Sequence, residues 1–140
     1  MRVHVERVAG DLYVLRLDDD EVKYFEALWY VPEGVTYNSY LLLTRDGAVL
    51  FDTWKHTYSE LFVDTLSKLL DLREIKYIVV HHMEQDHSGA LPAVLKQSSE
   101  ATVIAHPMVL DMIRSFYHIQ PKFKPVSDRA VLEFGGYKLR

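Results

Sequence analysis

One short segment concentrates side chains that could bind a metal. Residues 81–89 read HHMEQDHSG and hold three imidazoles and two carboxylates. The segment follows a mostly apolar run at residues 76–80, which predicts a central strand covered on both faces. Ligand sites in α/β sheets gather at the carboxyl ends of strands. Because so many ionisable groups are costly to hold together without a cation, the segment predicts a metal site.

The candidate metal ligands are His82, Glu84, Asp86 and His87. Side chains two apart in an extended segment point the same way, so the first three are expected to converge, and His87 is free to serve a second metal. The chain has no cysteine. A donor set of imidazole nitrogen and carboxylate oxygen suits iron or manganese at least as well as zinc. The plainer alternative is a polar turn with helix-capping carboxylates.

Two neighbouring residues are candidates for supporting roles. His81 directly precedes the ligand segment and is expected to orient a ligand or to pack, not to bind metal. Asp52 ends the apolar strand predicted at residues 48–51. Its carboxylate could hydrogen-bond to the ligand loop or could cap the following turn, and both interpretations stay open.

The segment also resembles a known family. Residues 82–89, HMEQDHSG, match the H-x-E-x-D-H-S-G signature of flavodiiron proteins, which join a metallo-β-lactamase-like domain to a flavodoxin-like domain. The sequences GVTYNSYL at residues 34–41 and LFDT at residues 50–53 are similar as well. The resemblance runs from about residue 8 to residue 140 and covers the amino-terminal half of that domain. The zinc hydrolases of the wider superfamily carry a histidine where Glu84 stands. An anionic oxygen ligand at this position favours iron redox chemistry.

The resemblance implies a function and a ligand set. His82 and Glu84 would bind one iron and Asp86 and His87 the second, and in the superfamily an aspartate at the position of Asp52 supports the ligand loop. The family reduces dioxygen to water or nitric oxide to nitrous oxide, with electrons from FMN, usually on the partner subunit. The implied partners are a second copy of the chain, a flavodoxin-like domain, and a redox donor such as rubredoxin, flavin reductase or reduced deazaflavin.

Residues 1–140 are expected to form a partial diiron domain with no flavodoxin-like domain. The family's remaining ligands lie beyond this stretch, so the site is expected to be incomplete and the isolated chain inactive. No catalytic residue beyond the metal ligands stands out, and no G-x-G-x-x-G motif predicts flavin or nucleotide binding. Three alternatives stay open: a non-catalytic diiron module that senses or binds dioxygen and is completed by dimerisation, a zinc hydrolase, and an inert fragment.

The surrounding elements predict an α/β fold. Alternating or apolar runs predict strands at residues 3–8, 12–17, 22–31, 37–44, 48–51, 76–80 and 101–105. A capping-box pattern at Thr57 begins a helix that reaches residue 70, Ser88 caps a short helix through residue 96, and a helix with a core-facing stripe follows Pro107. Residues 123–140 predict two strands around Gly135-Gly136. The expected architecture is the amino-terminal half of a metallo-β-lactamase-like αββα layered fold, a mixed sheet with helices packed on it.

Two further patterns bear on the site and its surroundings. The acidic run at residues 18–21 predicts a solvated turn between strands. The aromatic residues Trp29, Tyr37, Tyr40 and Trp54 are expected in the core or at an interface. The 140 residues are 49% hydrophobic and 26% charged, as expected of one globular domain. A net charge of −4 argues against a nucleic-acid partner. No apolar run reaches the length of a signal peptide or membrane helix, so a cytoplasmic protein is expected.

Overall fold

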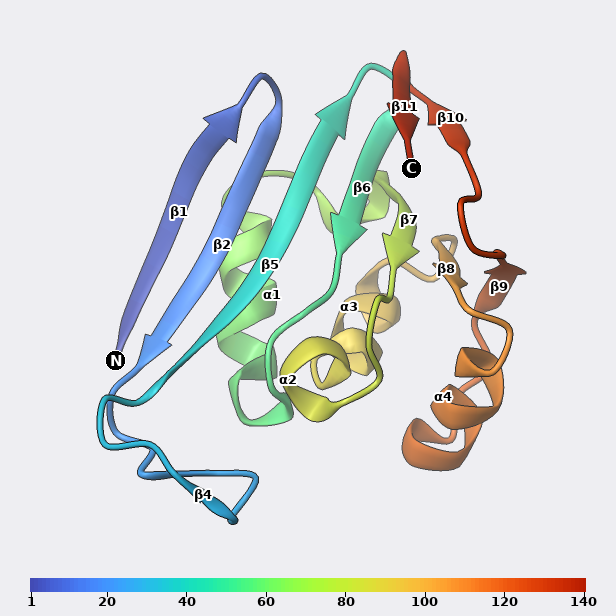
Figure 1. Cartoon of the computed structure of the whole chain (residues 1–140). Coiled ribbons are helices and arrows are strands. Elements are labelled where there is room, and N and C mark those ends of the chain that lie inside the picture. Colours follow the sequence, from blue (N-terminus) through green and yellow to red (C-terminus); the bar gives the residue numbers. More distant parts are fainter.

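A seven-stranded mixed sheet forms the centre of the molecule (Figure 1). The computed structural model describes residues 1–140. The strands lie in the order β1-β2-β5-β6-β7-β8-β9. Their bounds are β1 Arg2–Ala9, β2 Leu12–Asp19, β5 Val35–Thr44, β6 Gly47–Phe51, β7 Ile75–Val79, β8 Thr102–Ala105 and β9 Lys122–Pro125. The pairs from β1 to β6 are antiparallel and those from β6 to β9 are parallel.

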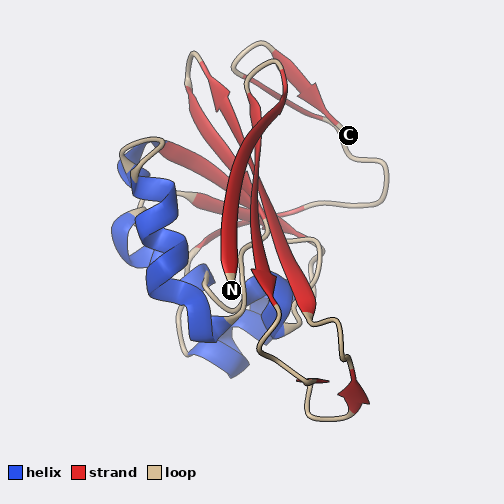
Figure 2. Cartoon of the chain, turned by 90° about the vertical axis from the view of Figure 1, so that its left-hand side faces the viewer, coloured by secondary structure: helices blue, strands red, loops and turns tan.

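The helices cover one face of this sheet (Figure 2). They are α1 Ser59–Ser67, the one-turn α2 Gln85–Ser88, α3 Leu91–Gln97 and α4 Val109–Tyr117, with 3-10 turns at His56–Tyr58 and Leu72–Glu74. The core lies between helices and sheet, where Leu41, Leu50, Phe62 and Ile78 are fully buried. The crossovers through helices are what parallel neighbours require. The expected α/β architecture, a mixed sheet with helices packed on it, is confirmed.

Two small hairpins lie outside the seven-stranded sheet. β10 Leu132–Phe134 and β11 Tyr137–Leu139 pair around Gly135-Gly136, as the sequence predicts. The strand expected over residues 22–31 is wrong: it is replaced by β3 Tyr24–Phe25 and β4 Trp29–Tyr30, two-residue strands joined by a tight turn. Glu26 and Ala27 in that turn both have positive φ. The aromatic residues that suggested a strand are largely exposed, since this hairpin extends away from the sheet (Figure 1).

Three details of the predicted helices are also corrected. Thr57 does not cap α1, because a 3-10 turn precedes that helix and its first residue has no side-chain cap. Ser88 does not begin a helix but ends α2, with its hydroxyl bonded to the carbonyl oxygens behind it. The stripe on α4 is only partly core, since Val109 and Ile113 are buried whereas Met108 and Phe116 are more than half exposed. None of the helices combines the length and the apolar character needed to span a bilayer.

Candidate metal centre

The sheet brings two loops from distant parts of the sequence to one edge. β6 and β7 are parallel and paired up to Phe51 and Val79, so their carboxyl ends meet there. Asp52 follows β6, and its backbone N–H donates to the carbonyl of Val79 over 2.9 Å. The segment that begins at His81 follows β7. The topology therefore places the β6–α1 loop beside the predicted ligand loop, at the kind of edge where α/β proteins bind ligands.

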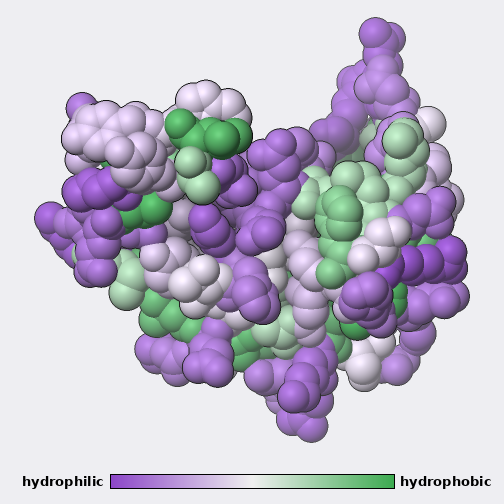
Figure 3. Space-filling model, turned by 90° about the horizontal axis from the view of Figure 1, so that it is seen from below, coloured by the Kyte–Doolittle hydropathy of each residue, from purple (hydrophilic) through white to green (hydrophobic).

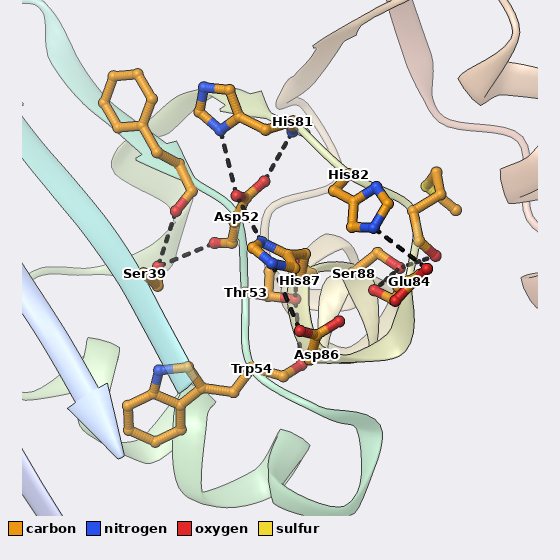
Figure 4. A network of polar contacts seen from close by, with 12 residues as sticks. Ser39, Asp52, Thr53, Trp54, His81, His82, Glu84, Asp86, His87 and Ser88 are labelled. Atoms are coloured by element: carbon orange, nitrogen blue, oxygen red, sulfur yellow. Dashed lines mark hydrogen bonds and ion pairs between the residues drawn. The ribbon is translucent and has the colours of Figure 1, made fainter. Parts of the chain in front are cut away.

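Asp52 is the anchor between the two loops (Figure 4). Its Oδ1 accepts the backbone N–H of His81 over 2.8 Å, and its Oδ2 lies 3.2 Å from Nδ1 of His81 and 3.0 Å from Nδ1 of His87. Asp52 is buried and has a left-handed φ of 54°. Such a backbone conformation is costly for a residue with a side chain, and it persists only where surrounding contacts fix it.

The charge state of Asp52 determines how the two imidazoles can act. Burial would raise the pKa of Asp52, but the hydrogen bonds from His81 and His87 outweigh burial and hold the pKa below its ordinary value. The hydrogen bond between the side chains of Asp52 and His81 also raises the pKa of His81. Since a carboxylate only accepts hydrogen bonds, Nδ1 of His87 must carry the hydrogen, and in the neutral ring the lone pair is on Nε2. That is the tautomer a metal-binding histidine requires.

Backbone contacts hold the ligand loop against the β6–α1 loop. The N–H of Thr53 donates to the carbonyl of His87 over 2.6 Å, and the hydroxyl of Thr53 donates to the same oxygen over 2.9 Å. The N–H of Ala90 donates to the carbonyl of Trp54. A β-carbon at Gly89 would overlap the backbone nitrogen of His56, so only glycine allows this close approach. The position of His87 is thus fixed from both the side chain and the backbone.

The four predicted ligands form two imidazole–carboxylate pairs. His82 Nε2 lies 3.4 Å from Glu84 Oε1, and His87 Nε2 lies 3.5 Å from Asp86 Oδ2. The rings of His82 and His87 are 5.4 Å apart. The expected convergence of the first three ligands is wrong, because the segment is not extended: Asp86 and His87 lie in α2. No group of three or more His, Cys, Asp or Glu side chains is close enough to hold an ion together.

The two pairs fit the donor chemistry of iron. Two ligands bonded at ~2.1 Å to one ion, at angles from octahedral to tetrahedral, lie ~3.0–3.4 Å apart. The observed spacings are close to this range. Each pair offers one nitrogen and one oxygen donor and no sulfur, a set that suits iron. Asp86 Oδ1 is buried without a hydrogen-bond partner, so this carboxylate has capacity left for a further interaction.

A cleft opens beside the first pair. It has a volume of about 570 Å³, and its lining includes His82, Glu84, Glu26 of the β3–β4 turn and Phe116 of α4. Figure 3 views this end of the molecule and shows a hollowed surface in which polar side chains lie next to apolar ones. A small molecule could therefore reach the His82–Glu84 pair from solvent.

Sequence reasoning missed several residues around the loop. The hydroxyls of Ser88 and Tyr117 lie 2.7 Å apart, and Ser88 Oγ also donates to the carbonyl of Met83 over 2.9 Å, so α4 braces the ligand loop. Asp19 was expected in a solvated turn but is buried and accepts a hydrogen bond from Tyr58. No local residue pattern identifies the Ser88–Tyr117 and Tyr58–Asp19 contacts, because each joins segments far apart in the sequence.

Comparison with known proteins places the chain in a family. A family model described as "ODP family beta lactamase" matches residues 35–138. The anaerobic nitric oxide reductase flavorubredoxin of Vibrio vulnificus is 31% identical over 140 residues, which are 99% of this chain and 28% of the relative. Diflavin flavoprotein A 1 of Synechocystis is 30% identical over 84% of this chain and 20% of the relative. The chain therefore spans less than a third of the length of these curated relatives.

Solved structures agree. A mutant of the flavo di-iron protein of Thermotoga maritima has a TM-score of 0.92 and 42% identity, covering 98% of this chain and 35% of that chain. The rubredoxin oxygen:oxidoreductase of Desulfovibrio gigas has a TM-score of 0.88 and 24% identity, covering 96% of this chain and 34% of that chain, which shows the fold alone. The sheet, the helices and the matched sequence lead to one conclusion: the chain is similar to flavo di-iron proteins in sequence and fold, and it belongs to the ODP family of β-lactamase-like proteins.

Proposed function

We propose that residues 1–140 supply part of a non-haem diiron centre that reduces dioxygen to water or nitric oxide to nitrous oxide. The observation that carries the proposal is the pair of imidazole–carboxylate contacts at the strand ends, His82 with Glu84 and Asp86 with His87. Mixed nitrogen and oxygen donors suit iron, and a carboxylate at position 84 favours redox chemistry over hydrolysis. The names of the relatives, which include a flavo di-iron protein and a nitric oxide reductase, support the same function.

Each residue would have a distinct role. His82 and Glu84 would hold one iron and Asp86 and His87 the second. When bound, the two irons would bind the diatomic gas and transfer electrons to it. Asp52 keeps the hydrogen of His87 on Nδ1 and so directs the Nε2 lone pair away from itself. His81 donates to the same carboxylate and is a positioning residue, not a ligand.

Electrons would come from outside residues 1–140. The relatives include flavoproteins, a flavorubredoxin and a rubredoxin oxygen:oxidoreductase. We propose that FMN on a flavodoxin-like domain, in a homo-oligomer, reduces the centre and is itself reduced by rubredoxin or a similar donor. The cleft beside the His82–Glu84 pair gives the gas access to the proposed centre.

One observation also supports a second candidate function, a diiron module completed by dimerisation. Because no three donor side chains gather within these residues, an ion bound here needs further ligands. They could come from other residues of the same protein or from a second copy of this chain. In the latter case the chain would be a diiron module, completed by dimerisation, that binds dioxygen without turnover. β1 is an edge strand with an exposed face, which allows pairing with another copy.

Anaerobic loading with Fe²⁺ tests the proposal. The iron content per chain and the mass in solution are measured for the wild type, for His82→Ala and His87→Ala, and for the control His4→Ala, which lies in β1 away from the loop. We expect iron to be lost in the first two variants and kept in the control. Once the further ligands are supplied, by the rest of the protein or by a second copy of the chain, the reduced wild type, separated from excess reductant, should consume dioxygen or nitric oxide. Iron without consumption would favour the binding module, and zinc with hydrolysis of an ester would overturn the proposal.

A further inference from the structure

The β3–β4 hairpin presents large apolar side chains to solvent. Tyr24, Leu28, Trp29 and Tyr30 are all more than half exposed, and Leu28 reaches 74%. The hairpin extends from the end of the sheet at which α2 and the ligand loop lie (Figure 1). Exposed apolar side chains grouped in this way commonly mark a surface that another surface covers.

A second exposed apolar surface lies on α4, where Met108 and Phe116 are also more than half exposed. The hairpin and α4 stand on either side of α2 (Figure 1). Both line the cleft of about 570 Å³ beside the His82–Glu84 pair, the hairpin through Glu26 and α4 through Phe116. Because burial of apolar surface is favourable, two apolar surfaces that border one cleft would cover each other if one of them moved.

The hairpin is built as a unit on a closely packed base. Its two short strands pair with each other, and the N–H of Val31 extends the pairing to the carbonyl of Lys23 over 2.9 Å. At the base, a β-carbon on Gly34 would lie 2.2 Å from the carbonyl oxygen of Asp19, so only glycine fits there. Short segments outside any strand join the hairpin to β2 and β5. A paired tip on a fixed base with short connections is the construction of a hinged lid.

An ion pair ties the turn of the hairpin to the rest of the molecule. Glu26 Oε1 lies 3.7 Å from Nζ of Lys55 in the β6–α1 loop. The same oxygen is buried and accepts no hydrogen bond. Glu26 and Ala27 have φ values of 48° and 60°, which are unfavourable for residues with a side chain. A buried oxygen held only by a long ion pair, in a strained turn, costs free energy, so the hairpin can leave this position easily.

We propose that the β3–β4 hairpin is a lid that closes over the cleft onto α4, and that the Glu26–Lys55 ion pair is the latch that holds it open. In the open position the side chains of His82 and Glu84 are 54% and 61% exposed. Closure buries apolar surface on both sides of the cleft and shields this pair from bulk water, as lids over reactive centres do. The inference rests on the proposed function only for what the lid encloses, because the movement itself needs no iron.

Disulfide trapping in the metal-free chain tests the closure. The chain has no cysteine, so an introduced pair has no competitor. Ala27→Cys in the exposed turn and Met112→Cys in the cleft wall keep both apolar surfaces, and they can be bridged only if their Cα atoms approach within about 7 Å. We expect an intramolecular disulfide under mild oxidation. The control pair, Ala27→Cys with Val8→Cys at the end of β1 far from the hairpin, should form none. No disulfide in the first pair, or one between two chains, would overturn the lid.

The rate of trapping tests the latch. Lys55→Gln in the double-cysteine chain should speed disulfide formation about two- to fivefold, the size expected when a partly exposed ion pair is removed. Lys68→Gln, which breaks an exposed ion pair with Asp64 on α1, is the matched control and should leave the rate unchanged. An unchanged rate in Lys55→Gln would show that the ion pair is no latch, and a slower rate would show that it favours the closed form.

The trapped chain then tests what the lid encloses. Diethylpyrocarbonate modifies exposed imidazoles, and mass spectrometry gives the extent of reaction at His82. The disulfide-bonded chain should lose most of this reaction and regain it on reduction, whereas His4 on β1 should react equally in both forms. Equal reaction of His82 in both forms would show that the closed hairpin does not shield the pair. Since none of these measurements uses iron, failure of the lid leaves the proposed function standing, and failure to bind iron or consume gas leaves the lid standing.

Discussion

Substitutions at Asp52 should change the stability of the chain and its metal affinity to different degrees. Asp52 accepts three hydrogen bonds, from the backbone N–H of His81 and from Nδ1 of His81 and His87. Asp52→Asn keeps an oxygen for the backbone N–H and tolerates the left-handed φ of 54°, which asparagine adopts more readily than most residues. The new side-chain amide, however, places its N–H groups opposite Nδ1 of His81 and of His87, which also carry hydrogens, so donor faces donor.

The expected outcome follows from which tautomer His87 then adopts. If the ring moves its hydrogen to Nε2, Nδ1 can accept from the new amide, and stability falls by only about 1–2 kcal/mol. The Nε2 lone pair is then lost, and metal affinity should fall about 10–100-fold, the usual effect of removing a group that orients a ligand. Asp52→Ala removes all three acceptors and also has an unfavourable positive φ, so we expect a stability loss of about 3–5 kcal/mol.

The assay combines three measurements on the same proteins. Titration with Co²⁺ or Fe²⁺ gives metal affinity, urea unfolding of the metal-free chain gives stability, and NMR of the imidazole nitrogens gives the tautomer of His87. Asp64→Asn, on the exposed surface of α1, is the matched control and should change none of them. An Asp52→Asn chain with wild-type metal affinity and a hydrogen still on His87 Nδ1 would refute the reasoning, because Asp52 would then not determine the tautomer.

Three further predictions concern the frame around the site and one surface carboxylate. Gly89→Ala should destabilise the chain by about 2–3 kcal/mol in urea unfolding, because its β-carbon would overlap the backbone of the β6–α1 loop; a cost near zero would show that the loop can move aside. Trp54→Phe should cost about 2–3 kcal/mol by the same assay, since it leaves the Leu15 carbonyl, now bonded to Nε1 over 3.0 Å, unpaired in the core; an unchanged midpoint would contradict this. The hydrogen bonds from Arg73 lower the pKa of Asp71 to about 2, so an NMR titration should find this carboxyl still charged where other exposed carboxyls are protonated. Arg73→Ala should return that pKa toward 3.8, and an unchanged value would rule out the ion pair as the cause.

The fold was predictable where local pattern determines structure. The alternation at residues 3–8 and 12–17 predicts a hairpin, and β1 and β2 pair there around Gly10, whose φ is positive. The apolar run at residues 76–80 predicts β7, which is a central strand. The expected cover on both faces is wrong, since the helices lie on one face (Figure 2) and Lys76 is exposed. Where apolar residues do not face the core, the pattern misleads. The aromatics of residues 22–31 suggested a strand, but they lie on a short hairpin whose turn requires positive φ at Glu26 and Ala27.

The candidate site was predictable in its residues but not in its geometry. Spacing identified His82, Glu84, Asp86 and His87 as candidate ligands, yet it assumed an extended loop, and the one-turn helix at Gln85–Ser88 produces two pairs instead. The support from Tyr117 and the burial of Asp19 depend on contacts across the fold, which no local pattern encodes.

The change from antiparallel to parallel pairing at β6 has a consequence for folding. β1 with β2 and β5 with β6 are hairpins between consecutive strands, so those pairings need only short loop closures. The pairing of β6 with β7 needs the whole α1 crossover to be in place. Since contacts between distant residues form slowly, we expect the ligand loop to assemble late in folding. A metal that binds there would then recognise only the finished structure and would shift the equilibrium toward the native state by mass action.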